Sequence, residues 1–260
     1  SKGIPKKNIY PINGHPLISY TLYAALKSKY INDVYVSTDS KEIARESIKY
    51  GAKVPFLRSK ALSADRVSSY TSLVNFVNKI ENKHKFKYDF IIELPCVCPF
   101  RTSNYIDQAI ELILRKKIYD SVTSYVNTGE KHPIRLKRIS KAKVTNFCKD
   151  YPEPEIKSFR QDFEKSYIRN GAIYLMTRHC LFNLKSRLGK KNYPLIMPME
   201  KSLNIDEKFD LLVAKSLIET GYCENKPEIK FNSKFEIYQN RNRKKLLISA
   251  PFDFIKKEKN

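Results

Sequence analysis

Residues 34–57, VYVSTDSKEIARESIKYGAKVPFL, have the pattern of one strand–helix–strand unit. The run from Val34 to Asp39 is short and rich in β-branched residues, which is typical of a buried strand. Residues 40–50 show helical spacing, and Gly51 is the residue type that most often follows the end of a helix. A second short strand is predicted at 53–57. Because a helical crossover usually joins parallel strands, this stretch predicts an α/β fold.

The same alternation continues on both sides of this unit. An apolar segment at 17–29 begins after Pro16, a favoured residue in the first turn of a helix. Further strands are predicted at 88–94 and 120–126. The rhythm predicts an open, mostly parallel, doubly wound (Rossmann-like) sheet with helices on both faces. The apolar stripes of two further helices are Leu73, Phe76, Val77 and Ile80, and Ile106, Ala109, Ile110, Ile113 and Leu114.

The rhythm breaks between about 128 and 166. This stretch is proline-containing and has little periodicity, which predicts short antiparallel strands and a loop that leave the main sheet as a lid or a dimer arm. A strand at 167–176 then returns to the sheet. We expect one domain over 1–223 and a tail over 224–260, which is either a flexible extension or the start of a further module. A final helix at 207–220 is predicted to bury Phe209, Leu212, Val213 and Leu217.

The composition limits the possible functions. The chain has 260 residues, a net charge of +22 and 42% hydrophobic residues, as expected of a folded protein with one large domain. No apolar run reaches the roughly 18 residues of a membrane helix, so no membrane insertion is expected. The excess of lysine fits either a solvated surface or anionic small substrates, and the sequence has no motif that favours nucleic acid. Five cysteines without a C-x-x-C pair favour reduced thiols in the cytoplasm.

Several segments are expected to meet at one edge of the sheet. Right-handed crossovers bring the carboxyl ends of parallel strands together, and α/β proteins bind ligands there. Residues 1–8 (SKGIPKKN) have the composition of a turn whose amides and lysines surround a triphosphate, although the Walker G-K-[ST] pattern is absent. The other segments expected at this edge are 37–40 (STDS), 95–102 (PCVCPFRT) and 170–174 (NGAIY).

These segments resemble the CMP-N-acetylneuraminic acid synthetase, or acylneuraminate cytidylyltransferase, family, including its legionaminic and pseudaminic acid relatives. The resemblance covers residues 1 to about 220 and implies a fold of the nucleotide-diphospho-sugar transferase type. In that family a buried strand, an arginine and glycines precede the opening motif, so we expect this chain to lack the first strand and part of the nucleotide-binding motif. The matching stretches, in family order, are SKGIPKKN (1–8), NGHPLISYTL (13–22), VYVSTDSKEIA (34–44), YGAKVPFLRS (50–59), LPCVCPFRT (94–102), HPIRLK (132–137), FRQ (159–161), YIRNGAIYLM (167–176) and MPMEKSLNIDEKFDLL (197–212).

The resemblance implies a reaction in which the anomeric hydroxyl of an acidic sugar attacks the α-phosphorus of CTP and pyrophosphate leaves. It assigns Lys2 and Lys7 to the CTP phosphates as catalytic residues, with Ser1 and Asn8 supporting the phosphate turn and the nucleotide. Such a displacement depends on neutralised charge and on in-line placement.

Two further residues match the contacts of the family with cytosine. Arg58 and Ser69 supply a guanidinium and a hydroxyl, which can hydrogen-bond to the carbonyl and amino groups of the base. Ser69 precedes a predicted helix, as does Asp39, so the alternative role for both residues is a helix N-cap.

The acidic sugar carries a carboxylate, which a bidentate arginine suits. The resemblance assigns Arg160 and Arg169 to it, with Lys137 nearby in the pattern and Asn170 beside the sugar. Arg101 matches an arginine of the family as well, and its alternative role is to stabilise its own loop through backbone carbonyls. Any one of these basic residues could instead belong to the solvated surface.

The implied cofactor is Mg²⁺, which takes oxygen ligands from one or two carboxylates and from substrate phosphates. The family uses a D-x-D pair where this chain has Asn204, Ile205 and Asp206, and the alternative role for Asp206 is to cap the final helix. Pro95 replaces a glutamine that usually contacts the sugar, which points to a different sugar specificity or to reduced activity. Cys96 and Cys98 have no partners with which to form a metal site.

The expected function is therefore transfer of CMP from CTP to an acidic nonulosonic sugar, by a cytoplasmic homodimer that serves surface glycan synthesis. The alternatives are a CMP-Kdo synthetase and a nucleotide-binding or assembly module without turnover. A basic RNA-binding protein is a further alternative, which would show salt-sensitive RNA retention.

Overall fold

The computed structural model describes residues 4–31, 33–63, 67–150, 152–153 and 163–230, with the backbone of 245–248 and 256–257. The helices are α1 (Leu17–Lys27), α2 (Lys41–Lys49), α3 (Ser69–His84), α4 (Ser103–Arg115), α5 (Arg178–Phe182) and α6 (Lys208–Glu219). The strands are β1 (Pro11–Ile12), β2 (His15–Pro16), β3 (Phe90–Glu93), β4 (Ser121–Asn127), β5 (Lys137–Ser140), β6 (Lys143–Asn146), β7 (Tyr167–Thr177), β8 (Asn192–Ile196), β9 (Lys245–Ile248) and β10 (Lys256–Lys257). Short 3-10 turns are η1 (Lys7–Ile9), η2 (Lys60–Ser63), η3 (Pro133–Arg135) and η5 (Met199–Lys201). None of the helices in this part of the chain has both the length and the apolar character that spanning a membrane requires.

The main sheet is mixed, with the strand order β10–β9–β3–β7–β4–β8. β9 runs parallel to β3 and β8 runs parallel to β4, whereas β7 is antiparallel to both β3 and β4. The α/β fold class is confirmed, and the direction of β7 makes the sheet less parallel than the strand–helix rhythm suggested. A helical crossover favours parallel strands, but β7 follows the irregular stretch after β4 and enters in the opposite direction.

The stretch 34–57 contains the predicted helix, but its two predicted strands are reduced to short extended segments. Its two extended segments meet in a single parallel bridge between Tyr35 and Lys53. The amide of Val36 donates to the Lys53 carbonyl at 2.8 Å, and the Lys53 amide donates to the Val34 carbonyl at 2.7 Å. The parallel direction was predicted correctly, but the segments are not strands of the described main sheet.

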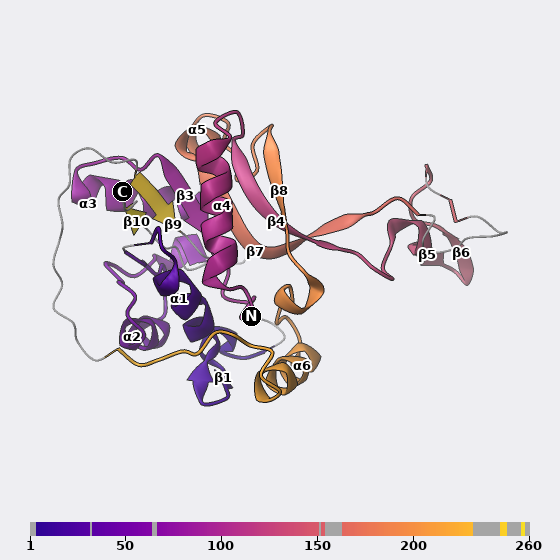
Figure 1. The fold of residues 1–260 in the computed structure, drawn as a ribbon, viewed down its shortest axis with the longest axis horizontal. Coiled ribbons are helices and arrows are strands. Elements are labelled where there is room, and N and C mark those ends of the chain that lie inside the picture. Colours follow the sequence, from indigo (N-terminus) through magenta and orange to yellow (C-terminus); the bar gives the residue numbers. More distant parts are fainter. Residues whose placement is uncertain are drawn as a thin grey trace.

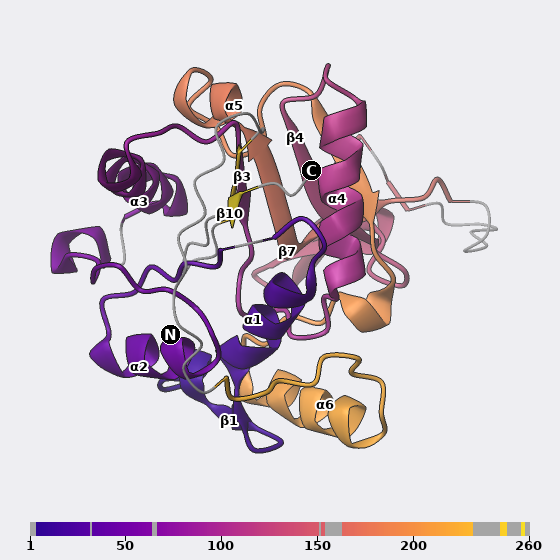
Figure 2. The same ribbon diagram turned by 60° about the vertical axis from the view of Figure 1, so that its left-hand side comes forward.

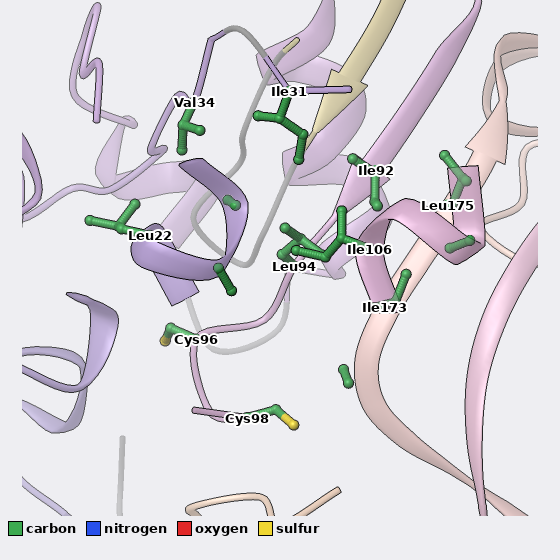
Figure 3. Packing of buried hydrophobic residues seen from close by; sticks show 14 of the residues in the cluster. Leu22, Ile31, Val34, Ile92, Leu94, Cys96, Cys98, Ile106, Ile173 and Leu175 are labelled. Atoms are coloured by element: carbon green, nitrogen blue, oxygen red, sulfur yellow. The ribbon is translucent and has the colours of Figure 1, made fainter. Parts of the chain in front are cut away.

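Successive residues of β3 face opposite sides of the sheet, which creates a core on each side. Ile92 packs in a cluster with Leu22 of α1 and Ile106 of α4, whereas Ile91 packs with Phe76 of α3 and Leu181 near the end of α5. Figure 2 shows α1 and α4 on one side of the strands and α3 on the other. Cys96 and Cys98 belong to the first cluster and lie beyond the end of β3 (Figure 3). The loop that follows β3 is therefore anchored in the core by these two side chains.

The irregular stretch does leave the main sheet. β5 and β6 form a separate antiparallel hairpin, in which Lys137 pairs with Asn146. Figure 1 shows this hairpin at the end of a long extension from β4 and β7, far from the helices that cover the sheet. Its role as a lid or a dimer arm stays a prediction.

The buried face of α6 differs from the predicted one. Leu211 and Ala214 are buried, whereas Phe209 is 71% exposed and Leu212 is 65% exposed, so the prediction for these two was wrong. Two apolar stripes with helical spacing run along this helix, and periodicity does not tell which of them faces the core. Contacts with Ile12 and Leu17 near the N-terminus select the stripe that contains Leu211.

The beginning of the expected tail packs on the domain. Asn225 is buried, and its Nδ2 donates to the carbonyls of Pro99 at 2.6 Å and Arg101 at 2.9 Å. Further along, the β9 backbone lies beside β3, with Leu247 opposite Ile91. Residues 231–244 lie outside the described part of the chain.

Candidate active site

Three chain segments meet beyond the carboxyl end of β3: the loop 95–102, the turn η1 and the segment 202–206 that leads into α6. The backbone joins two of them directly, because the Ile205 amide donates to the Val97 carbonyl at 2.8 Å. The Cys98 thiol donates to the Lys201 carbonyl at 3.4 Å. These hydrogen bonds hold the segment that precedes α6 against the loop 95–102, although the two segments lie about a hundred residues apart in the chain.

An ion pair connects the predicted phosphate-binding turn with the predicted metal ligand. Lys7 Nζ lies 2.8 Å from Asp206 Oδ1. The Lys7 side chain is only 11% exposed, whereas that of Asp206 is 67% exposed. Two residues with different predicted roles, 199 positions apart in the chain, therefore share one site.

Asp206 is not the cap of α6. Glu207 occupies the N-cap position and forms a capping box with Asp210. Asp210 Oδ2 accepts hydrogen bonds from the amides of Asp206 and Glu207, both at 2.8 Å. The Asp206 carboxylate therefore serves no capping function, and its side chain remains directed to Lys7.

Asn204 offers a second oxygen close to this carboxylate in the chain. Its Oδ1 is buried and has no hydrogen-bond partner among the described residues. Its amide lies against Gly171, where a Cβ would come within 3.4 Å of Asn204 Nδ2, and the φ of +68° at Gly171 also disfavours a side chain. An unpaired amide oxygen and a carboxylate match the hard oxygen ligands that Mg²⁺ takes. Within the described ranges, no group of three or more His, Cys, Asp or Glu side chains could hold a metal ion.

Asn8 accepts a hydrogen bond from the Cys96 thiol, a group that the motifs did not assign to the site. Cys96 Sγ donates to Asn8 Oδ1 at 2.9 Å, and Cys96 is 1% exposed. Burial raises the pKa of the Cys96 thiol to about 12, against the opposing influence of the Lys7 charge. The thiol therefore stays protonated and can donate to Asn8. The departure from the family pattern at position 96 was the signal that could have revealed this contact.

Arg101 lies entirely inside the protein. Its Nη1 donates to the carbonyls of Pro95 at 3.1 Å and Ala172 at 2.7 Å, and its Nη2 donates to Thr21 Oγ1 at 2.7 Å. Its exposed fraction is 0%, which leaves no surface for a sugar. This placement contradicts direct sugar binding and supports the alternative role, which is to hold the loop 95–101 in shape.

The two predicted cytosine residues belong to the segment 58–69, between the bridge at Lys53 and the first turn of α3. The Arg58 amide donates to the Thr38 carbonyl at 2.8 Å, and Arg58 Nε donates to Ser63 Oγ at 2.9 Å. Ser69 is the exposed first residue of α3, and Ser68 caps the helix by accepting from the Thr71 amide. Similarly, Ser40 rather than Asp39 caps α2. Ser69 and Asp39 are therefore not the N-caps, while the contact of Ser69 with a base stays a prediction.

The predicted sugar-binding residues are dispersed. Asn170 is buried on β7, where its Oδ1 accepts from Ser124 Oγ at 2.6 Å and its Nδ2 donates to Ser202 Oγ at 2.8 Å. Arg169, its neighbour, is exposed. Lys137 lies on the hairpin and pairs with Glu153 at 2.8 Å, so the structure does not bring it to Lys7 and Asp206. Ser1, Lys2 and Arg160 lie outside the described residues.

A second charged pair lies on the opposite face of the sheet. Glu93 of β3 is 2% exposed and forms an ion pair with Arg187. Burial raises the pKa of Glu93 to about 7, although the Arg187 charge and hydrogen bond lower it. Along β3, Glu93 lies on the same side of the sheet as Ile91, which packs against α3 and α5, and not on the side of Ile92 and the cluster that contains Cys96.

Comparison with known proteins identifies relatives over most of the chain. A family model described as cytidylyltransferase matches residues 1–242. The N-acylneuraminate cytidylyltransferase A of Danio rerio is 34% identical over 88% of this chain, which spans about half (51%) of that protein. A pseudaminic acid cytidylyltransferase of Campylobacter jejuni is 30% identical over 85% of this chain and 93% of its own length. The CMP-N,N'-diacetyllegionaminic acid synthase of Legionella pneumophila is 32% identical over 84% and 92%, respectively.

A solved structure supports the fold. A CMP:2-keto-3-deoxy-manno-octonic acid synthetase complexed with CTP superimposes with a TM-score of 0.62, covering 85% of this chain and 94% of that one. At 16% sequence identity, this likeness bears on the fold alone. It confirms the predicted nucleotide-diphospho-sugar transferase type of architecture.

Proposed function

The chain belongs to the cytidylyltransferase family, and from this we propose that it transfers CMP from CTP to an acidic nonulosonic sugar with release of pyrophosphate. The relatives in a fish and two bacteria are named for N-acylneuraminic, pseudaminic and legionaminic acids. All three names describe nine-carbon acidic sugars, so the proposed substrate is a sugar of this class.

The observation that carries this proposal is the contact between Lys7 and Asp206. Transfer of a nucleotidyl group needs positive charge on the phosphates and an in-line approach more than it needs covalent catalysis. Lys7, with Lys2 and Ser1, would bind the CTP phosphates, and Asn8 would hold the nucleotide beside them. The anomeric hydroxyl of the sugar then attacks the α-phosphorus and passes its proton to solvent water. The bond from the α-phosphorus to the oxygen that bridges it to the β-phosphorus breaks, and pyrophosphate leaves with that oxygen.

Asp206 and Asn204 are the proposed ligands of a magnesium ion. Mg²⁺ bound to substrate phosphates would supply further charge neutralisation for the leaving pyrophosphate. Two observations support this assignment: Asn204 Oδ1 has no hydrogen-bond partner among the described residues, and the Asp206 carboxylate is not used to cap α6. Asn204 contributes no charge, so this chain would bind the ion through one carboxylate only.

For the sugar, we assign the carboxylate to Arg169 and Arg160, because a guanidinium binds a carboxylate through two parallel hydrogen bonds. Arg101 supports the site from inside by holding the loop 95–101. Arg58 and Ser69 remain the proposed contacts of the cytosine ring.

The proposal extends to assembly and cellular setting. The hairpin exposes Ile139, Val144 and Phe147, with exposed fractions of 75%, 63% and 54%. Exposed apolar residues on a protruding hairpin support a homodimer, which light scattering on the purified chain would detect. The free thiols of the cysteines, four of them buried, support a reducing cytoplasmic location.

A pyrophosphate-release assay tests the function. The chain is incubated with CTP, Mg²⁺ and, one at a time, a sialic, a legionaminic and a pseudaminic acid, with Kdo as the eight-carbon comparison. Release with at least one nine-carbon acid and little with Kdo is expected. Release only with Kdo would identify the other synthetase, and CTP binding without any release would identify a module without turnover.

A matched pair of variants links the assay to the site. Lys7→Met should lower turnover by roughly 10²- to 10³-fold, the usual cost of removing one charge-stabilising donor. Lys6→Met removes the same charge one residue earlier, from an exposed pair with Glu42, and should leave turnover nearly unchanged. Equal effects of the two substitutions would refute the phosphate role of Lys7.

A further inference from the structure

The contact between Lys7 and Asp206 has a consequence for how ligands enter the site. We propose that this ion pair makes the binding of CTP and of the divalent cation interdependent, because each ligand must take one member of the pair. The proposal rests on the proposed function and deepens it. Without nucleotide, Lys7 holds the carboxylate that the cation needs, and without cation, Asp206 holds the ammonium that the triphosphate needs.

The backbone on both sides of the pair is fixed, so only the side chains can exchange partners. On one side, the Tyr10 amide donates to the Lys7 carbonyl at 3.0 Å within η1. On the other side, Ile205 is fully buried and bonded to Val97, and Asp210 binds the Asp206 amide. The backbones of Lys7 and Asp206 are therefore anchored near each other, and an exchange of partners involves only their side chains.

Charge balance explains why each ligand alone binds poorly. A divalent cation that takes Asp206 leaves the Lys7 ammonium, a largely buried like charge, beside it. Asn204 is neutral and cannot offset that repulsion. Conversely, a triphosphate that takes Lys7 leaves an anionic carboxylate next to its own negative charge. When both ligands are present, ammonium faces phosphate and carboxylate faces cation, so every charge has an opposite neighbour.

The interaction between the two ligands is reciprocal by thermodynamic necessity. If the cation raises the affinity for CTP by some factor, CTP raises the affinity for the cation by the same factor. Coupling of this kind between two sites typically amounts to about 5- to 150-fold. The pair thus acts as a gate that favours simultaneous occupation of the site.

Lys6 provides a matched control within the same turn. It forms an ion pair with Glu42 at 2.8 Å, but both side chains are largely exposed, at 70% and 53%, and Glu42 lies at the start of α2. A change at Lys6 therefore removes the same charge without freeing Asp206. Long-range effects of net charge would act on both variants, whereas the gate acts on Lys7 alone.

Manganese serves as the probe, because its free aqueous ion has an electron paramagnetic resonance signal that is lost on binding. The chain, Lys7→Met, Lys6→Met and the double variant Lys7→Met/Asp206→Asn are titrated with Mn²⁺ without nucleotide. We expect Lys7→Met to bind Mn²⁺ at least about fivefold more tightly than the unmodified chain. Lys6→Met should resemble the unmodified chain, and the double variant should lose the gained affinity.

Equal Mn²⁺ affinity in the unmodified chain and Lys7→Met would overturn the proposal, as would an equal gain in Lys6→Met. If Lys7→Met does not give a cooperative thermal transition, Lys7→Gln replaces it in the same comparison. CTP binding is measured separately by calorimetry with Mg²⁺ and with EDTA. Failure of the unmodified chain to bind CTP under either condition would refute the proposed function, whereas CTP affinity that is independent of the cation would refute only the gate.

Discussion

The buried pair of Glu93 and Arg187 should make the stability of the protein depend on pH. Burial raises the pKa of Glu93 to about 7 in the folded protein, from an ordinary value of 4.5. The folded state therefore keeps a proton on Glu93 at pH values where the unfolded state has lost it. The contribution of Glu93 to stability is fully present below about pH 4.5 and is lost as the pH rises through 7.

The size of the effect follows from the pKa difference between the two states. At about 1.4 kcal/mol for each pKa unit, the difference corresponds to about 3 kcal/mol between pH 4.5 and pH 8. For a chain of this size, that amounts to a melting temperature lowered by roughly 6–12 °C. Other groups also titrate over this range, so the prediction concerns the difference between variants.

Thermal unfolding of the protein and of Glu93→Gln, followed by circular dichroism from pH 5 to pH 8, measures this difference. Glu93→Gln cannot ionise and should lose less stability than the unmodified protein as the pH rises. Glu81→Gln is a matched control, because Glu81 is also buried and paired with an arginine, Arg178, but the variant keeps Glu93. Parallel pH curves for the protein and Glu93→Gln would show that the Glu93 carboxyl does not titrate in this range.

Three further predictions concern the site and α6. Cys96→Ala should raise the KM for CTP by roughly 3- to 10-fold, because Asn8 loses one hydrogen bond, and should also lower the melting temperature because Cys96 is buried in the core. Cys96→Ser keeps a donor and should keep the KM near that of the unmodified protein; steady-state kinetics in which both variants have an unchanged KM would contradict a role for this hydrogen bond. Arg101→Met should lower the free energy of unfolding by roughly 3 kcal/mol or more, because three buried acceptors lose their donor. Urea denaturation measures this, and an unchanged free energy of unfolding would contradict the structural role of Arg101. Leu211→Ala should cost about 2–5 kcal/mol in the same assay, whereas Phe209→Ser should stay within about 0.5 kcal/mol, and the reverse order would mean that α6 buries its other face.

Local patterns predicted a large part of this structure. The buried strand 88–94, the strand 120–126 and the returning strand 167–176 correspond to β3, β4 and β7, with bounds shifted by a few residues. The stripe at Leu73, Phe76, Val77 and Ile80 is buried as predicted. These features depend on side chains that are close together in the chain, and periodicity records that relation directly.

The resemblance to a family assigned two residues to the site that the structure brings into contact. Lys7 and Asp206 were assigned to phosphate and metal separately, and the structure places them in contact. It also corrected the assignment of Arg101, since a match to a motif does not reveal that a guanidinium is completely enclosed. The hydrogen bond from Cys96 to Asn8 was missed for the same reason, because neither residue type implies the other.

The amino-acid sequence by itself determined the α/β class, the position of the irregular hairpin and the excess of positively charged groups. Only the tertiary structure decided the direction of β7, the buried face of α6 and the pairing of Lys7 with Asp206. The physical reason is that helix and strand periods arise from neighbouring residues, whereas burial and ion pairing depend on segments that folding brings together from distant parts of the chain.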